Sequence, residues 1–301
     1  MSVLPRMSCP ADDTYEVWLE LLPLQASPEL LRFLGDSLAA YLRQTGLNLY
    51  VLGLSGGLDS SFLAALLHVH HIPYLGFCLP ITSNTPAEID RAVRAATAYA
   101  NPPEGLSVQA VCDLSALYAQ ISQNFQTCFP RSTPVAEGNL KARIRMQFLY
   151  HAASLHGGCV LGTDQLDELL MGFWTLHGDV GDISPLQFIP KTVEYDLARM
   201  LCRELTQPEP LMAAIEAVPT DGLGISASDL DQLGVESYAA VEELFRTFFQ
   251  LKLVEQRRLL HDSEQAALDV LMATEPLRRF FTSGHKRTGP IFFDPRQACS
   301  C

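Results

Sequence analysis

The fold is decided by residues 47–61, which read Leu47-Asn-Leu-Tyr-Val-Leu-Gly-Leu54 and then Ser55-Gly-Gly-Leu-Asp-Ser-Ser61. The first part is a nearly continuous apolar run, which is typical of a strand buried on both faces of a parallel sheet. The second part is a glycine-rich turn, and a helical pattern follows it from Ser60 to about His70. A strand, a turn and a helix in this order predict the start of an open α/β sheet.

The segments on either side of this unit repeat the alternation of strand and helix. Upstream, the Ser-Pro pair at residues 27–28 predicts an N-cap with proline at the first helical position, and the apolar stripe that follows ends near Gly46. Downstream, residues 73–79 predict a second strand, and a capping box at residues 85–88 begins another helix. Further strands are expected at 107–114 and 159–162, and further helices at about 115–125 and 138–156.

This order predicts a doubly wound parallel sheet with flanking helices and right-handed crossovers, the Rossmann-like arrangement of α/β proteins. Beyond Thr192 the pattern is helical, with a loop expected over residues 208–224. We expect a helical extension at residues 1–46, followed by one catalytic domain at residues 47–301 with a helix-rich C-terminal part.

Composition and charge exclude several classes of function. The chain has 301 residues, 48% of them apolar, and a net charge of −13, so it can build a full core but lacks the clustered Lys and Arg of a general nucleic-acid binder. Its longest apolar runs fall short of the about 18 to 20 residues that a membrane-spanning helix needs, and its N-terminus lacks the pattern of a signal peptide. The 8 cysteines lack the paired spacing of a zinc site or a disulfide framework. We therefore expect a cytoplasmic protein that binds neither nucleic acid nor a membrane.

The turn at residues 55–61 predicts a pyrophosphate site. Its glycines let the backbone approach a phosphate closely, its amides and hydroxyls are donors, and the next helix directs its positive N-terminus at the anion. Asp59 would repel phosphate unless a magnesium ion lay between them, so a metal is expected. An ordinary strand-to-helix turn is the alternative, but the full Ser-Gly-Gly-Xaa-Asp-Ser string in this context favours phosphate binding. No lysine follows the glycines, which disfavours a kinase or ATPase of the GxxxxGK[ST] type.

Residues of the second half fit a nucleotide site at the carboxyl ends of the strands. Thr163 and Glu168 follow the expected fourth strand, where ligands collect in open α/β sheets, so Glu168 would meet Asp59 at one magnesium ion. Lys191 carries a compact positive charge suited to triphosphate oxygens. Glu168 and Lys191 also fit solvated surface positions, and from the residues alone both interpretations stay open.

Two basic pairs and one aromatic residue leave further alternatives open. Arg143 and Arg145 flank one position on an expected helix and so point in different directions. One would hold a carboxylate or phosphate in a bidentate fork, and the other would pair with an acidic neighbour. His285 and Lys286 lie between glycines, in a segment that suits a mobile loop over a ligand or a solvated basic turn. Tyr150 fits either a stacking contact with a substrate ring or a place in the core.

The string at residues 55–60 resembles the signature of the N-type ATP pyrophosphatases, enzymes that adenylate a carbonyl or carboxyl oxygen and release pyrophosphate. Within that class, the order of the later motifs is similar to that of the ammonia-dependent NAD synthetases, and the resemblance covers residues 47–293 with gaps. These motifs are Gly138-Asn139-Leu140-Lys141-Ala142-Arg143-Ile144-Arg145-Met146, Gly162-Thr163 with Glu168, Gly172-Phe173-Trp174-Thr175, Gly178-Asp179, Asp182-Ile183-Ser184-Pro185, Lys191, Pro219-Thr220 and His285-Lys286-Arg287.

The resemblance implies an ATP-dependent ligase that amidates deamido-NAD to NAD with ammonia, through an adenylated carboxylate. It also implies ATP and Mg²⁺ as cofactors and a homodimer. Asp59 and Lys191 would act in adenylation, and Asp182 would receive or orient a proton of ammonium in the second step. ATP contacts are implied for Gly53, Ser55, Gly56, Gly57, Asp59, Ser60, Thr163, Lys191 and Thr220, magnesium contacts for Asp59 and Glu168, and deamido-NAD contacts for Asn139, Arg143, Tyr150, Asp182, His285 and Lys286.

Three positions depart from the family pattern. Leu176 stands where the family has a lysine that contacts deamido-NAD, Cys78 stands where an arginine usually contacts ATP, and the segment 178–182 is shorter than usual by a residue. Two alternatives therefore stay open: a paralogue that adenylates a different carboxylate, and a non-catalytic nucleotide-binding protein of the same fold. Because no segment reads as a glutaminase or nitrilase domain, ammonia is expected from solution or from a separate subunit.

Overall fold

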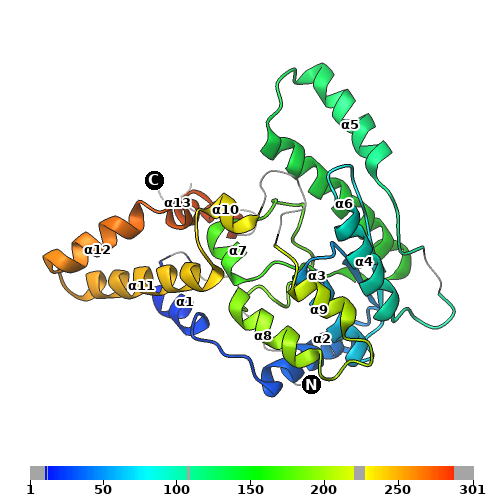
Figure 1. Ribbon diagram of the computed structural model, residues 1–301, viewed down its shortest axis with the longest axis horizontal. Helices are drawn as coiled ribbons and strands as arrows, with labels where there is room; N and C mark the ends of the chain where they lie inside the picture. The colour runs from blue at the N-terminus through cyan, green and yellow to red at the C-terminus, as the bar shows by residue number, and fades with distance from the viewer. Residues whose placement is uncertain (1–10, 12, 107–108, 220–227, 288–301) are drawn as a thin grey trace, which may run out of the picture.

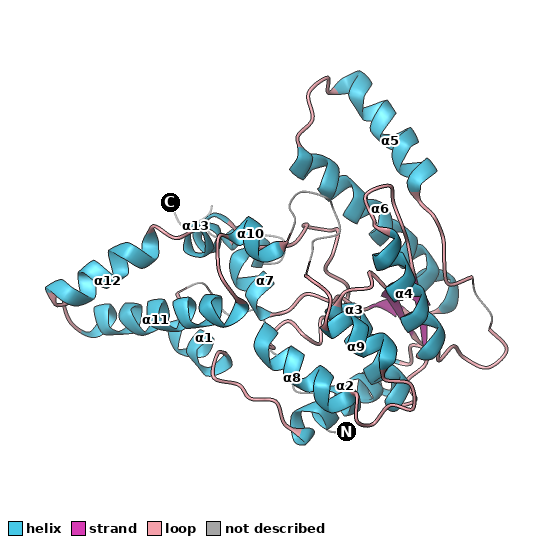
Figure 2. Cartoon of the chain, viewed as in Figure 1, coloured by secondary structure: helices cyan, strands magenta, loops and turns pink. Residues whose placement is uncertain are grey.

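The computed structural model describes residues 11, 13–106, 109–219 and 228–287, and a small parallel sheet lies among its helices (Figure 1, Figure 2). The strands are β1 (Tyr50–Gly53), β2 (Tyr74–Phe77) and β3 (Cys159–Val160), in the order β2-β1-β3. Both pairings are parallel, and Tyr50 lies opposite Tyr74 on one side and Cys159 on the other. The predicted parallel sheet with flanking helices is confirmed.

Helices cover both faces of the sheet, which explains why its strands read as continuous apolar runs. Tyr50 and Leu52 of β1 belong to the core on one face, whereas Val51 belongs to the core on the other. Successive side chains of a strand point to opposite faces, so a strand that is covered on both sides shows no polar period. The first face is covered by α2 (Pro28–Thr45), α3 (Leu58–Val69), α4 (Pro86–Ala98), α8 (Lys191–Leu201) and α9 (Glu209–Ile215), and the second by α6 (Pro134–His156), on which α5 (Ser115–Cys128) packs.

Local capping sets the boundaries of these helices. At the start of α2 the Ser27 Oγ accepts a hydrogen bond from a backbone N–H at 3.1 Å, and Gly46 ends this helix with a φ of 73°. The predicted capping box at residues 85–88 is present at the start of α4. Helix α6 begins earlier than residue 138, where we expected it, because Thr133 caps it and Pro134 takes its first position.

The predicted strands are shorter in the structure. Among the described residues, the segment 107–114 contributes a single bridge, in which Val111 pairs with Cys78. Pro80 gives the physical reason, because it lacks an N–H group and cannot continue the hydrogen-bond ladder beyond the end of β2. The first and fourth predicted strands are likewise reduced to β1 and β3.

A second core, rich in aromatic side chains, holds the C-terminal part. Phe245 and Phe248 are fully buried and contact Phe280, and the buried Phe249 stacks on Trp18. Because Trp18 lies in α1, the N-terminal helix packs beside α11 although the two are far apart in the sequence (Figure 1). None of the described helices is long and apolar enough to span a membrane. The helices of this part are α1 (Tyr15–Leu21), α7 (Leu166–Met171), α10 (Asp229–Leu233), α11 (Tyr238–Arg257), α12 (Asp262–Met272), α13 (Glu275–Thr282) and α14 (Gly284–Arg287).

The loop predicted over residues 208–224 is wrong in its first part, because residues 209–215 form α9. Two prolines in this segment suggested a loop, yet proline is tolerated in the first turn of a helix. Leu211 and Ala214 are buried where α9 packs against α3 and α4, so burial decides the conformation. Residues 220–227 lie outside the described part of the chain.

Candidate active site

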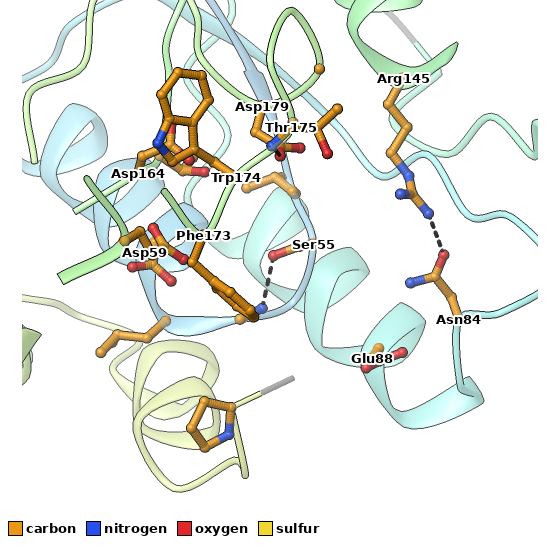
Figure 3. A pocket seen from close by; sticks show the side chains of 18 of the residues that line it. Ser55, Asp59, Asn84, Glu88, Arg145, Asp164, Phe173, Trp174, Thr175 and Asp179 are labelled. Atoms are coloured by element: carbon orange, nitrogen blue, oxygen red, sulfur yellow. Dashed lines mark hydrogen bonds between the residues drawn. The ribbon is translucent and has the colours of Figure 1, made fainter. Parts of the chain in front are cut away.

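A cavity of about 400 Å³ opens at the carboxyl ends of the strands (Figure 3). The loop after β1, the turn after β2 and the segment after β3 all line it, and residues of α6, α7 and α8 complete its walls. Ligands of open α/β sheets bind at this edge, and a volume of this order accommodates a nucleotide-sized ligand. The geometry therefore places a ligand site where the sequence predicted one.

The phosphate loop is held in shape by its own hydroxyl groups. The Gly57 N–H donates to Ser55 Oγ at 3.1 Å, and the Ser55 N–H donates to Ser60 Oγ at 3.1 Å. Gly56 adopts a φ of 82°, and a Cβ atom there would lie 2.3 Å from the carbonyl oxygen of Glu88, so this position requires glycine. Of the predicted loop contacts, Gly53, Ser55, Gly57 and Asp59 line the cavity, whereas Gly56 and Ser60 shape the loop from behind it.

Lys191 forms the centre of a cluster of carboxyl groups at one end of the cavity. Its ammonium group pairs with Asp59 and, at 3.0 Å, with Glu194 Oε2. Burial acts to lower the pKa of Lys191, but Asp59 and Glu194 outweigh it and raise that pKa well above the usual value. Burial, and after it the charge of Asp59, raises the pKa of both Glu168 and Glu194 well above the usual range. The structure thus brings together Asp59, Glu168 and Lys191, which are far apart in the sequence.

The donor set of this cluster fits a magnesium ion. Asp59, Glu168 and Glu194 carry more negative charge than Lys191 can balance, and carboxylate oxygens are the ligands that Mg²⁺ prefers. The part of the chain that the structure describes holds no group of three or more His, Cys, Asp or Glu residues arranged to hold a metal ion by themselves. A magnesium ion at Asp59 and Glu168 would therefore need oxygen atoms of a bound nucleotide, as is usual for this ion.

Arg145 reaches the cavity from the wall opposite Asp59 (Figure 3). Its Nε donates to the Leu79 carbonyl at 3.0 Å, and its Nη2 donates to Asn84 Oδ1 at 2.8 Å. Arg143 points the other way, and its Nε donates to the Leu176 carbonyl at 3.2 Å. The sequence left open which arginine binds a ligand anion, and the structure places Arg145, which the resemblance did not single out, in the cavity.

A second hollow, of about 500 Å³, holds several of the predicted deamido-NAD contacts. Arg143, Tyr150 and His177 line it, and Met146 lines both this hollow and the main cavity. The Tyr150 hydroxyl donates to Asp182 Oδ1 at 3.0 Å. The other carboxylate oxygen of Asp182 accepts from a backbone N–H of β3 at 2.9 Å, so this exposed residue is held at the sheet edge and does not line the main cavity.

The segment expected to be a mobile loop forms the short helix α14 in the structure. Lys286 lines the main cavity, where its ammonium group donates to the Gly172 carbonyl at 2.7 Å and lies 5.3 Å from the centre of the Trp174 ring. His285 is exposed and does not line the cavity. Contacts with packed backbone therefore fix this segment. The remaining predicted contacts Asn139 and Thr163 also line the cavity, and Thr220 lies outside the described residues.

Two acidic residues of the cavity wall were missed by sequence reasoning. Asp164 is 4% exposed, and its Oδ2 has no hydrogen-bond partner within the protein. Burial, followed by the charges of Asp179 and Asp59, raises its pKa well above the usual value. Asp179 lines the same wall and accepts a hydrogen bond from the Thr175 N–H at 2.5 Å. The signal was present, because both lie inside the quoted motifs Gly162-Thr163 to Glu168 and Gly178-Asp179.

The site belongs to the ATP pyrophosphatase class of nucleotide sites, because the loop after β1 offers amides and hydroxyls without the lysine of a GxxxxGK[ST] loop, on a doubly wound parallel sheet. Within that class the chain belongs to the NAD synthase family, whose family model matches residues 30–290. The predicted family and the predicted class of enzyme, a ligase that forms C–N bonds, are confirmed.

Similar proteins match this chain over most of its length. The NH₃-dependent NAD⁺ synthetase of Methanosarcina acetivorans is 31% identical over 254 residues, covering 82% of this chain and 90% of that protein. The protein of the same name from Methanococcoides burtonii is 29% identical over 275 residues, covering 89% of this chain and 94% of its own. The crystal structure of NAD⁺ synthetase from Burkholderia pseudomallei superposes with a TM-score of 0.64 and 25% identity over 95% of this chain and 100% of that one. NMN synthetase from Francisella tularensis shares the fold, with a TM-score of 0.65 and 21% identity over 93% of this chain and 99% of its own.

Proposed function

We propose that the protein amidates deamido-NAD to NAD with ammonia, using ATP and releasing AMP and pyrophosphate. The observation that carries this proposal is that one cavity unites the phosphate loop, Lys191 and Arg145 in a chain of the NAD synthase family. The names of the relatives, NH₃-dependent NAD⁺ synthetases, support the same reaction.

In the first step, a carboxylate oxygen of deamido-NAD attacks the α-phosphorus of ATP, and the bond from that phosphorus to pyrophosphate breaks. The attacking carboxylate already carries its charge, so the protein needs no nucleophile, and positioning and charge neutralisation dominate. The amides and hydroxyls of residues 55–60 hold the phosphates. Lys191 and Arg145 supply positive charge from opposite walls of the cavity. Thr163 and Thr220 complete the proposed ATP contacts.

Magnesium is proposed at Asp59 and Glu168. When bound there, it would neutralise charge on the triphosphate oxygens and on the leaving pyrophosphate. The excess of carboxylate oxygens around Lys191 supports this placement. Since Asp59 also pairs with Lys191, it would hold the ion and the ammonium group in fixed relation to the same phosphates.

In the second step, nitrogen binds the activated carbon, the bond from that carbon to the AMP oxygen breaks, and a proton leaves the ammonium. Asp182 was our candidate to receive or orient that proton, but it lies outside the main cavity. Asp164 is the better candidate, because it is buried in the cavity wall with a carboxylate oxygen that has no partner within the protein. A buried carboxylate of this kind attracts and orients a small cation.

The dinucleotide substrate is proposed to extend from the main cavity into the second hollow. Asn139 and Lys286 would contact it in the first, and Arg143 and Tyr150 in the second. Met146 lines both hollows, so they adjoin. Asp182 would then position Tyr150 through their hydrogen bond. His285 remains a proposed contact of the same substrate.

A pyrophosphate-release assay with ATP, magnesium and ammonium tests this function. Release should require deamido-NAD, and the mononucleotide that carries the same nicotinate carboxylate should be a poorer acceptor. The variant Asp59→Ala should lose release altogether, whereas Asp90→Ala, which removes an exposed partner of Arg94, should keep it. Release that Asp59→Ala leaves near the wild-type level would contradict the metal assignment. Release without any acceptor, or with an unrelated carboxylate alone, would contradict the choice of substrate.

A homodimer in the cytoplasm, supplied with ammonia from solution, is proposed as the working form. Large apolar side chains on α5 and α6 support the dimer, because Phe125, Phe129 and Leu155 are 50%, 65% and 66% exposed. Sedimentation of the purified protein checks the assembly, and a monomer at micromolar concentration would contradict it. A full rate with ammonium alone would show that no separate ammonia-supplying subunit is needed.

A further inference from the structure

The first turn of α8, which carries Lys191, is capped by side chains from two other helices. Pro190 precedes this helix and forms no side-chain cap. The Lys191 N–H donates to Asp167 Oδ2 at 2.9 Å, and the Thr192 N–H donates to Glu242 Oε1 at 3.0 Å. The Thr192 hydroxyl donates to Glu242 Oε2 at 2.7 Å. Carboxyl groups from α7 and α11 thus take the N–H groups that the helix itself leaves without partners.

The contact between Glu242 and Thr192 is well buried. Glu242 is 6% exposed, and each of its carboxylate oxygens accepts one hydrogen bond from Thr192. A negative charge at a helix N-terminus is also stabilised by the helix dipole. A hydrogen-bonded carboxylate in a buried position fixes geometry strongly, because losing its partner would leave polar groups unpaired away from water.

Glu242 also joins the two cores of the molecule at the active site. It lies on α11, which belongs to the aromatic core, whereas α8 packs on the sheet. Thr192 is the residue next to Lys191, so the same contact fixes the backbone from which the Lys191 side chain extends. The ammonium group at the end of that side chain pairs with Asp59 and Glu194.

We propose that Glu242 is a positioning residue, which holds the first turn of α8 through Thr192 so that the Lys191 ammonium meets the phosphates of the nucleotide. The inference rests on the proposed function, in which Lys191 binds phosphate. Glu242 does not line the cavity, so it acts through Lys191 and not on the ligand. No motif of the sequence pointed to it.

Steady-state kinetics of Glu242→Ala, Glu242→Gln and Thr192→Val test the proposal. Glu242→Ala should lower kcat by about ten-fold or more, because small displacements of a charged group at the reacting centre are costly. The KM for ammonium should stay within about two-fold, since ammonium does not meet Lys191. Glu242→Gln should recover most of kcat, because its amide oxygen still accepts from the Thr192 N–H. Adding Thr192→Val to Glu242→Ala should cause no further loss, because both remove one interaction.

Glu264→Ala is the matched control. Glu264 accepts a hydrogen bond from the His261 N–H at 2.9 Å and caps α12 away from the cavity, so its loss should lower stability and leave kcat unchanged. Unchanged kinetics in folded Glu242→Ala, or a Gln variant as slow as the Ala variant, would overturn the proposal. Should the Ala variant fail to fold, Thr192→Val decides in its place, and wild-type kcat in that variant would overturn the proposal. A wild-type enzyme that releases no pyrophosphate would instead refute the proposed function.

Discussion

Replacing Lys191 with methionine tests the charge cluster directly, because methionine keeps an unbranched apolar chain and removes the ammonium group. The side chain of Lys191 is 4% exposed and that of Glu194 is 0% exposed, and they pair at 3.0 Å. Removing one partner of a buried ion pair costs about 3 to 5 kcal/mol, because the other charge is left uncompensated. Asp59 is 24% exposed, so solvent screens its share, and we expect a loss near the lower end, about 3 kcal/mol.

The loss should depend on pH with a definite sign. Burial, and after it the charge of Asp59, raises the pKa of Glu194 well above its ordinary value of 4.5. The folded protein therefore holds a proton that the unfolded chain releases, so this group's contribution to stability is present below pH 4.5 and is lost as the pH rises through the folded pKa. Without Lys191 that pKa rises further, so the destabilisation of Lys191→Met should be larger at pH 8 than at pH 5.

Urea unfolding followed by circular dichroism at both pH values measures this effect. A loss of 3 kcal/mol corresponds to a fall in Tm of about 6 to 12 °C at pH 8. Lys252→Met is the control, because Lys252 and Glu255 are 26% and 41% exposed and their pair should contribute less than about 1 kcal/mol. A Lys191→Met protein as stable as the wild type at pH 8, or equally destabilised at both pH values, would refute the reasoning.

Three further predictions concern single residues. Gly56→Ala should abolish ATP binding measured by calorimetry, because its Cβ would lie 2.3 Å from the Glu88 carbonyl oxygen at a φ of 82°; normal affinity would refute the loop geometry. Arg145→Met should raise the KM for ATP by about ten-fold or more, whereas Arg143→Met should change only the KM for deamido-NAD; the reverse pattern would exchange their roles. Burial raises the pKa of Asp167 from 3.8 to about 7, so its contribution to stability falls as the pH rises through that interval, and Asp167→Asn should flatten the unfolding free energy between pH 4 and 7. An unchanged pH profile in this variant would contradict the assignment.

The sequence by itself determined the features that depend on neighbouring residues. The apolar run 47–54, the phosphate turn after it and the capping box at 85–88 are local, because each is set by side-chain period, glycine geometry or hydrogen bonds within one turn. The order of the motifs pointed to the family in the same way. Where propensity was ambiguous, as in α9, packing decided the conformation.

Only the tertiary structure decided which of these residues meet. Asp59 and Lys191 are 132 positions apart, and their pairing depends on how α3 and α8 pack on the sheet. Arg143 and Arg145 are equivalent in the sequence, but the face of α6 that packs on the sheet turns one toward the cavity and the other away. Glu242 reaches α8 from a different core. Such contacts join segments whose separation along the chain says nothing of their distance in space, so the hydrophobic packing of the helices fixes them and no local pattern encodes them.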